Sequence, residues 1–406
     1  MMAPPREFTV GERIAYFRLR TGLSQKALGE LVGRTENWMY KVEAGLIPVD
    51  SVKMLISLAT ALHVDLADLT GGFLQGGGGS LTEHPQVPAV RRILSLPTSL
   101  LGQFGTAMET GDYITAVAGA RAVYDTKRMR YSEVGTQLPA LLENGYATLR
   151  AAGDDVDQLE AIRGLISLYS LMEVWLRRVG QFDLARQAAD RGMLLADETG
   201  DPEFRAAAAW KIACALTSSG LVDDSLDLVQ RMIAHCEPGE GASQGHIAAF
   251  GALHLQGAVA AVRFNKAPLG WDLLRRAERV ARRLDGEANL WNTCFGITNV
   301  AMHSVHLAAE EGNAAEALRF ADDVVIGEGQ PLERVARYWL EIVNCNRIVN
   351  DDYGTVHMLG KVKDLSPEEI YYSPLARQAV LDLMGREKPT WGPDLRAIAR
   401  HMEIVQ

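Results

Sequence analysis

The sequence has few of the features expected of a secreted, metal-binding or membrane protein. Its four cysteines are scattered, with no C-x-x-C spacing, which fits buried, reduced thiols rather than a zinc site or a disulfide framework. It has no run of 18 or more apolar residues, and its first residues lack the basic-then-apolar layout of a signal peptide. We therefore expect a cytoplasmic protein that does not enter a membrane.

Positive charge is also in short supply. The chain of 406 residues has 41 Lys and Arg against 51 Asp and Glu, a formal net charge of −10. Any contact with a polyanion must therefore be a local patch, because salt screens charges that lie far apart. Residues 1–60 reverse the balance, with eight Lys or Arg and six Asp or Glu.

Signatures of catalysis are missing as well. We find no G-x-x-x-x-G-K-[ST], G-x-S-x-G or H-E-x-x-H. His303 and His306 have a spacing that suits a metal, but no cysteine or second pair supports them, so we interpret them as part of a helix face. We expect neither an enzyme nor a cofactor or metal site.

The chain divides into three parts. Residues 8–70 are a series of short amphipathic segments, and residues 71–88 form a Gly-rich segment with four consecutive glycines, Gly76 to Gly79, which predicts a flexible linker. GGGGS is also an engineered linker sequence. Residues 89–406 have helical spacing almost throughout. Because β-branched alternation is nearly absent, we expect an all-α fold.

A recurring pattern in the long third part predicts a helical repeat. A turn residue is followed five positions later by a small residue: Gly180 precedes Ala185 and Gly220 precedes Ser225. The turns at Gly180, Gly220, Lys266, Gly312 and Asp352 are 40 to 46 residues apart, enough for two antiparallel helices. Stacked pairs of this kind form a tetratricopeptide-like α-solenoid, although the usual tetratricopeptide period is about 34 residues.

Five helices can be traced in residues 8–70, and the third, which follows Thr35, has two distinct sides. Met39 and Val42 share one side and predict an anchor on the core. The opposite side is polar, and by itself it predicts only a solvated helix face. Its residues are Glu36, Asn37, Tyr40 and Lys41.

Three motifs in this region carry a family resemblance. They are R-x-R-T-G-L-S-Q-x-x-L-x-x-x-V-G, a capped helix that ends in V-E-x-G, and L-x-x-L-A-x-A-L-x-V. Together they closely resemble the helix-turn-helix domain of phage-repressor-like (Xre family) regulators, in which the third helix enters the major groove of operator DNA.

The resemblance implies roles for individual residues. Glu36, Asn37 and Lys41 become candidates to read base edges, and Asn and Lys suit adenine and guanine. Glu36 has an alternative role, because a carboxylate also stabilises its own helix N-terminus. The other DNA-binding candidates are Gln25, Thr35 and Tyr40, for phosphate or sugar, and Trp38, which either touches a thymine methyl group or packs sideways.

The same resemblance implies a structural ion pair between Arg18 and Glu43, which removes Arg18 from the phosphate contacts. One weakly basic module binds DNA weakly, so we expect a homodimer whose two modules read half-sites about 34 Å apart or a multiple of that.

A helix-turn-helix domain followed by such repeats is similar to bacterial regulators whose repeats bind a signalling peptide or a small molecule. This implies an effector in residues 89–406, and a groove with Asn for a peptide backbone and Trp as apolar wall suits one. Packing between repeats is the alternative interpretation of the tryptophans. The candidates are Trp210, Arg263, Trp291, Asn292, Asn299 and Asn346, of which Trp291, Asn292 and Asn299 are predicted to share one helix.

The predicted function is therefore a sequence-specific, DNA-binding transcriptional regulator under effector control. A protein-interaction scaffold, whose repeats recruit a protein partner, is the alternative. Steep salt dependence of binding to one duplex favours the first.

Overall fold

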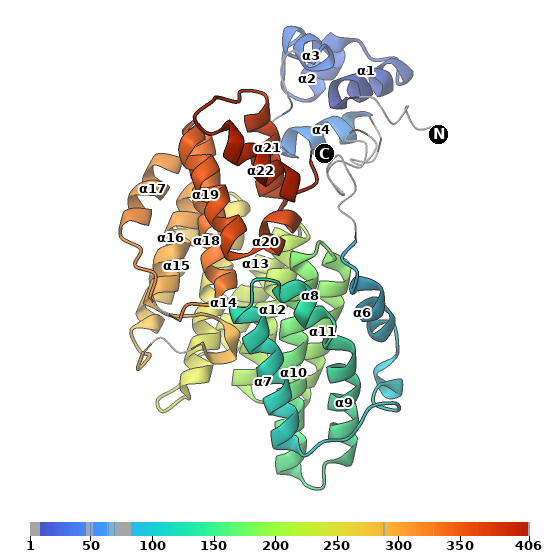
Figure 1. Cartoon of the computed structure of the whole chain (residues 1–406), viewed down its shortest axis with the longest axis vertical. Helices are drawn as coiled ribbons and strands as arrows, with labels where there is room; N and C mark the ends of the chain where they lie inside the picture. The colour runs from blue at the N-terminus through green and yellow to red at the C-terminus, as the bar shows by residue number, and fades with distance from the viewer. Residues whose placement is uncertain are drawn as a thin grey trace. The chain divides into compact units, whose positions relative to one another are not determined.

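The structure is a computed structural model that describes residues 9–45, 49, 52–62, 64, 69, 83–286, 289–327 and 329–404. Within those residues the only regular elements are helices, which confirms the predicted all-α fold (Figure 1). The chain forms two compact units, Met1–Glu83 and His84–Gln406. The predicted linker lies outside the described residues from 71 to 82, as does Leu66 of the predicted fifth helix.

The first unit contains four described helices: α1 (Val10–Arg20), α2 (Gln25–Leu31), α3 (Glu36–Glu43) and α4 (Val52–Leu62). Side-chain oxygens cap three of them, because Thr9, Ser24 and Thr35 accept hydrogen bonds from backbone N–H groups of the first turns. The helices enclose a single apolar cluster of Ile14, Phe17, Leu28, Met39, Val42, Leu58, Ala59, Leu62 and Leu69.

Two glycines set how the first three helices meet. Gly33 ends α2 with φ +68, a conformation that favours glycine, and so turns the chain sharply into α3. Gly11 lets α1 approach α3, because a Cβ at this position would lie 2.2 Å from the carbonyl oxygen of Val42. The orientation of α3 is therefore fixed by backbone contact as well as by its buried side chains.

The second unit is an array of helices. It begins with α6 (Val87–Leu94), the 3₁₀ turn η1 (Thr98–Leu100), α7 (Thr110–Thr126), α8 (Arg130–Gly135) and α9 (Leu138–Ala151). Five helix pairs follow, and short C-terminal helices pack on the last pair. The pairs are α10 (Asp155–Arg178) with α11 (Phe182–Thr199), α12 (Pro202–Ser218) with α13 (Val222–His235), α14 (Gln244–Arg263) with α15 (Ala267–Ala281), α16 (Ile297–Glu310) with α17 (Ala314–Asp322), and α18 (Leu332–Ile348) with α19 (Asp352–Leu365). The C-terminal helices are α20 (Pro367–Tyr372), α21 (Pro374–Met384) and α22 (Gly392–His401).

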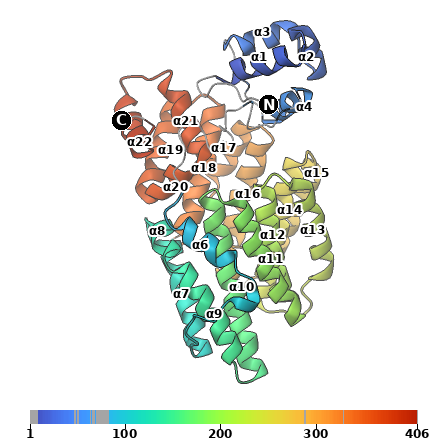
Figure 2. The same ribbon diagram turned by 90° about the vertical axis from the view of Figure 1, so that its right-hand side faces the viewer.

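The turns inside these pairs are the ones that the spacing predicts. Gly180 and Gly220 have φ +78 and +82 at the turns between the paired helices. Ala185 and Ser225, five residues later, are completely buried, so the second helix of each pair lies close to the first. Figures 1 and 2 show successive pairs side by side in the second unit. Gly111 is also followed five positions later by a small residue, Ala116, but it lies in the first turn of α7 and not in a turn between paired helices.

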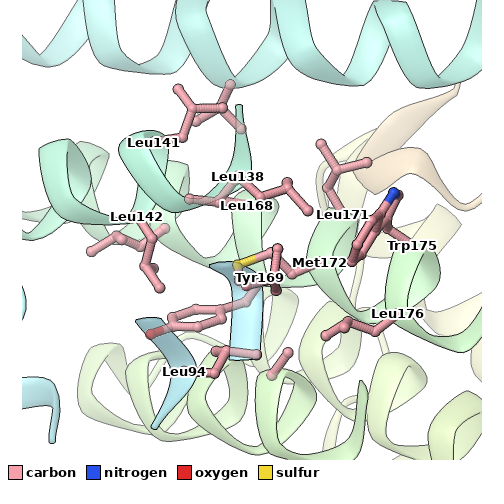
Figure 3. Packing of buried hydrophobic residues seen from close by; sticks show 14 of the residues in the cluster. Leu94, Leu138, Leu141, Leu142, Leu168, Tyr169, Leu171, Met172, Trp175 and Leu176 are labelled. Carbon is pink, nitrogen blue, oxygen red and sulfur yellow. The ribbon is translucent and has the colours of Figure 1, made fainter. Parts of the chain in front are cut away.

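Apolar side chains from several helices form the largest core of the second unit. Leu168, Tyr169, Met172 and Trp175 of α10 pack against residues of α6 and α9 (Figure 3). The helix α14 is long and apolar enough to cross a membrane, yet 89% of its apolar window is buried inside the unit. It is therefore a core helix of the array. The search for uninterrupted apolar runs in the sequence did not detect it.

Hydrogen bonds also join α8, near the start of this unit, to α20, near its end. Arg130 and Tyr131 of α8 donate to the Glu369 carboxylate of α20, and Glu368 accepts from the backbone N–H of Tyr131. All of these groups are buried. These contacts therefore join two parts of the array that are far apart in the sequence.

Two sequence-based predictions need correction here. The linker was expected to reach residue 88, but His84 and Val87 are buried in the second unit, where Pro88 occupies the first turn of α6. Trp291 and Asn292 were expected on one helix with Asn299. They form the 3₁₀ turn η2 (Leu290–Asn292) instead, because their φ angles of +51 and +56 are incompatible with an α-helix.

Candidate nucleic-acid interface and effector cleft

The helix α3 presents a polar face that is anchored from behind. Met39 and Val42 are 0% and 2% exposed and hold the helix on the core of the first unit. Thr35 caps its N-terminus by accepting from the Trp38 N–H at 3.2 Å. The exposed side chains on the outer side are those of Glu36, Asn37, Tyr40 and Lys41. The four polar candidates on α3 thus share one solvent-facing surface.

A buried ion pair fixes the other end of α3. Arg18 donates two hydrogen bonds to Glu43, from Nε at 2.6 Å and from Nη2 at 2.8 Å. Its Nη1 atom donates a third to the Leu23 carbonyl oxygen. The hydrogen bond to Glu43 raises the pKa of Arg18. Gln25 also donates to Glu43, at 2.7 Å. The Gln25 amide therefore supports the ion pair, while sequence analysis placed it among the phosphate contacts.

Trp38 packs in part against the core of its own unit. Its half-buried ring lies against the apolar core of the unit, and the Arg34 guanidinium lies over it at 5.3 Å from the ring centre. Arg34 itself is exposed beside the start of α3. This contact brings a further positive charge to the polar face.

The charge of this surface is close to balanced. Among the described residues of the first unit, the exposed bases are Arg20, Lys26, Arg34 and Lys41, and the exposed acids are Glu12, Glu30, Glu36 and Glu83. Non-specific attraction to phosphate grows with the number of unpaired bases. One such unit is therefore a weak polyanion binder by charge alone.

The second unit contains a polar cleft formed by the first helix of each of the five pairs. It holds about 720 Å³ of empty space, including its opening to solvent. Its lining residues come from α10, α12, α14, α16 and α18: Arg177, Arg178, Cys214, Thr217, Ser218, Gln256, Val259, Arg263, Met302, His303, His306, Arg334, Arg337, Tyr338 and Glu341.

Five arginines and one glutamate line this cleft. Three of the arginines have a close carboxylate partner. Arg177 donates to Glu173 at 2.7 Å, and the Nε atoms of Arg178 and Arg263 donate to Glu333 and Glu310 at 3.0 and 2.9 Å. These carboxylates hold much of the buried charge in place, as buried ions require.

The two histidines of the cleft occupy different surroundings. Burial lowers the pKa of His303 well below its usual range, and Arg334 lowers it further. His306 lies between two carboxylates, 3.1 Å from Glu341 and 3.4 Å from Glu310. Within the described residues, no group of His, Cys, Asp and Glu has the arrangement of a metal site.

The predicted effector residues are dispersed through the second unit. Arg263 lies in the cleft. Trp291 lines a smaller apolar cavity of about 280 Å³ and donates to Glu203 at 2.7 Å. Trp210 and Trp291 both pack against one apolar cluster, in agreement with the packing interpretation of the tryptophans. Asn299 and Asn346 are buried at 5% and 8% exposure, and the lining residues do not include them.

Sequence analysis missed most of the cleft. Arg177 and Arg178 end α10 just before the turn at Gly180, where a basic residue is common in any helix. Arg334 and Arg337 share a face of α18, but that spacing also fits an exposed surface. The five arginines of the cleft come from α10, α14 and α18, which are far apart in the sequence, so no local pattern joins them.

A family model described as a helix-turn-helix domain matches residues 9–70, so the first unit belongs to this class of domain. Among solved structures, the chain matches PlcR from Bacillus thuringiensis, in complex with the peptide PapR7 and DNA. The identity is 10%, the TM-score 0.31, and the match covers 94% of this chain and 99% of that chain. The comparison with curated proteins gives no match.

Proposed function

We propose that this protein is a sequence-specific, DNA-binding transcriptional regulator of the Xre type, in the bacterial cytoplasm, whose second unit binds an effector. The main support is the anchored polar face of α3 in a helix-turn-helix domain. In such domains the second of the two helices lies in the major groove and its exposed side chains meet base edges.

The proposed base readers are Asn37 and Lys41, with Glu36 beside them. An Asn amide offers a donor and an acceptor to adenine, and Lys donates to guanine N7 or O6. Tyr40, at 54% exposure, has a hydroxyl group suited to a phosphate or sugar contact. Arg34, held over Trp38, supplies a further cation near the backbone. Gln25 acts mainly through Glu43.

The nearly balanced charge of the first unit supports a dimer as the active form. A homodimer places two such units on two half-sites, and the contributions of the units to binding combine. Half-sites about 34 Å apart, or a multiple of that, follow from the helical repeat of DNA.

The effector is proposed to act from the cleft of the second unit. An effector changes operator affinity only if it binds two arrangements of the protein with different affinities. The cleft suits this role because its walls come from five helices, so a ligand there touches every pair of the array.

Selection of bound duplexes from a random DNA pool tests the function directly. We expect enrichment of one sequence with two related half-sites, and steep loss of its binding as salt increases. A pool without enrichment, or binding insensitive to salt, would reject the DNA function and favour a protein-interaction scaffold.

A further inference from the structure

One arginine of the cleft has no carboxylate in direct contact. Arg334, in the first turn of α18, lines the cleft, and none of the described carboxylates lies within ion-pairing distance of it. Its Nε atom is buried without a hydrogen-bond partner. An uncompensated buried charge is costly, so a group that supplies an acceptor gains affinity there.

The apparent partner of Arg334 cannot satisfy it. A terminal nitrogen of Arg334 lies 3.3 Å from His303 Nδ1. The same Nδ1 lies 2.8 Å from the Asn299 carbonyl oxygen, which only accepts, so Nδ1 carries the proton of that hydrogen bond. An atom that donates to Asn299 has no lone pair left for Arg334. The Nε and this terminal nitrogen of Arg334, a residue that lines the cleft, thus have no acceptor within the protein.

Arg337, one helical turn further along α18, is only loosely paired. Its carboxylate contacts, to Glu341 and Glu369, are both 3.9 Å long. Glu369 is already held at 2.5 Å by Arg130, and Glu341 by His306 at 3.1 Å. Because residues three apart on a helix face the same way, Arg334 and Arg337 present two neighbouring guanidinium groups.

We propose that this cleft binds a small organic anion, with a phosphate or carboxylate group held by Arg334 and Arg337. Guanidinium groups match both kinds of oxyanion by paired hydrogen bonds. Arg178 and Arg263, held by Glu333 and Glu310, form further parts of the cationic wall.

If the proposed function holds, this site identifies the effector of the regulator as a small anion. Only the regulatory role of the anion rests on the proposed function. Binding of the anion does not depend on DNA. The two claims therefore have separate measurements on the same full-length protein.

Calorimetric titration of the full chain with pyrophosphate, and separately with citrate, tests the site and distinguishes the phosphate from the carboxylate class. We expect saturable binding of at least one probe and about tenfold or greater loss of affinity in Arg334→Gln, the magnitude expected for hydrogen bonds to a charged group. Arg275→Gln is the matched control, since Arg275 is exposed on α15 and pairs only distantly with Asp272.

The melting temperature of Arg334→Gln distinguishes an anion-binding role from a structural one. If Arg334 serves to bind an anion, the variant melts at the same temperature as the wild type or higher, because it removes an unpaired charge. If Arg334 stabilises the fold, the variant melts at a lower temperature. Arg337→Gln gives a second measure of the binding loss should the first variant fail to fold. No binding of either probe at millimolar concentration, or equal affinity in the wild type and the Arg334 and Arg337 variants, overturns the proposal.

Operator binding, measured with and without the bound probe, distinguishes failure of the proposed regulatory role from failure of the proposed DNA-binding function. Anion binding without any change in operator affinity leaves the site intact and removes its regulatory role. Anion binding by a protein that binds no duplex removes the proposed function alone.

Discussion

Arg130 of α8 and Glu369 of α20, 239 positions apart in the sequence, form an ion pair of 2.5 Å that is almost completely buried. Tyr131 donates to the same carboxylate at 2.5 Å. Burial and the neighbouring Glu369 charge raise the pKa of Tyr131 well above its usual value, so this phenol stays protonated and remains a donor. The contact ties the beginning of the second unit to its end.

Removal of this carboxylate should destabilise the second unit strongly. Glu369→Ala leaves Arg130 charged and without its partner, and breaking a buried pair typically costs ~3–5 kcal/mol. Urea denaturation followed by circular dichroism measures the loss. Glu278→Ala, in the exposed pair with Arg282, is the control, with an expected change below about 1 kcal/mol. Similar losses in the two variants would contradict this view of the buried pair.

Base recognition by α3 predicts unequal losses across an operator. Asn37→Ala or Lys41→Ala should cost ~1–3 kcal/mol of binding, concentrated at particular base pairs of the selected duplex. Electrophoretic mobility shifts with single-base variants of that duplex measure it. Lys127→Ala removes an exposed charge from the second unit and should leave affinity unchanged. Unaltered binding by both α3 variants would refute the proposed readers.

The close approach of α1 to α3 predicts a large effect of one methyl group. In Gly11→Ala the new Cβ would meet the Val42 carbonyl oxygen, so α3 must shift, at a cost of ~1–3 kcal/mol. Operator affinity should fall with it, because the shift moves the polar face. Gly119→Ala, on the exposed side of α7 with no atom within 4 Å, should instead stabilise by about 0.5–1 kcal/mol. Thermal melting measures the change in stability, and electrophoretic mobility shifts measure the change in operator affinity. Unchanged stability and affinity in Gly11→Ala would show that α1 and α3 are not held in contact.

Acid should weaken the second unit through Glu341. Burial acts to raise its pKa, but His306 and Arg337 outweigh burial and lower the pKa from 4.5 to about 2. A carboxylate with a lowered pKa contributes stability above pH ~4.5, and the contribution is lost as pH falls toward 2. Melting curves between pH 7 and pH 2.5 should show a decline that is smaller in Glu341→Gln. Parallel declines would assign the acid sensitivity to other groups.

Local chemistry made much of the fold predictable. Thr35, Met39 and Val42 identified a capped and anchored helix because caps and helical spacing act over a few residues. Gly180 and Gly220 identified the turns for the same reason, since their positive φ angles follow from local backbone preference.

The errors came from residues whose state depends on distant contacts or on an ambiguous local signal. The Gly-rich segment was extended to Pro88, but proline is also favoured in a first helical turn, and burial of Val87 shows that the helix begins there. Trp291 takes a positive φ that its residue type disfavours, and it is held by Glu203, 88 positions away. The cleft depends on α10 meeting α18, as the Arg178–Glu333 pair shows, and no short-range pattern encodes that meeting.

The buried contact between Arg130 and Glu369 has a consequence for how the second unit unfolds. Open arrays of helix pairs can lose a terminal repeat while the others persist, because each repeat touches only its neighbours. Here the loss of α20 would expose the buried Arg130 guanidinium of α8. It would also remove Glu369, which accepts from Arg130, and Glu368, which accepts from the backbone N–H of Tyr131. Fraying from one end therefore weakens the other, and the array should melt in one cooperative transition instead of repeat by repeat.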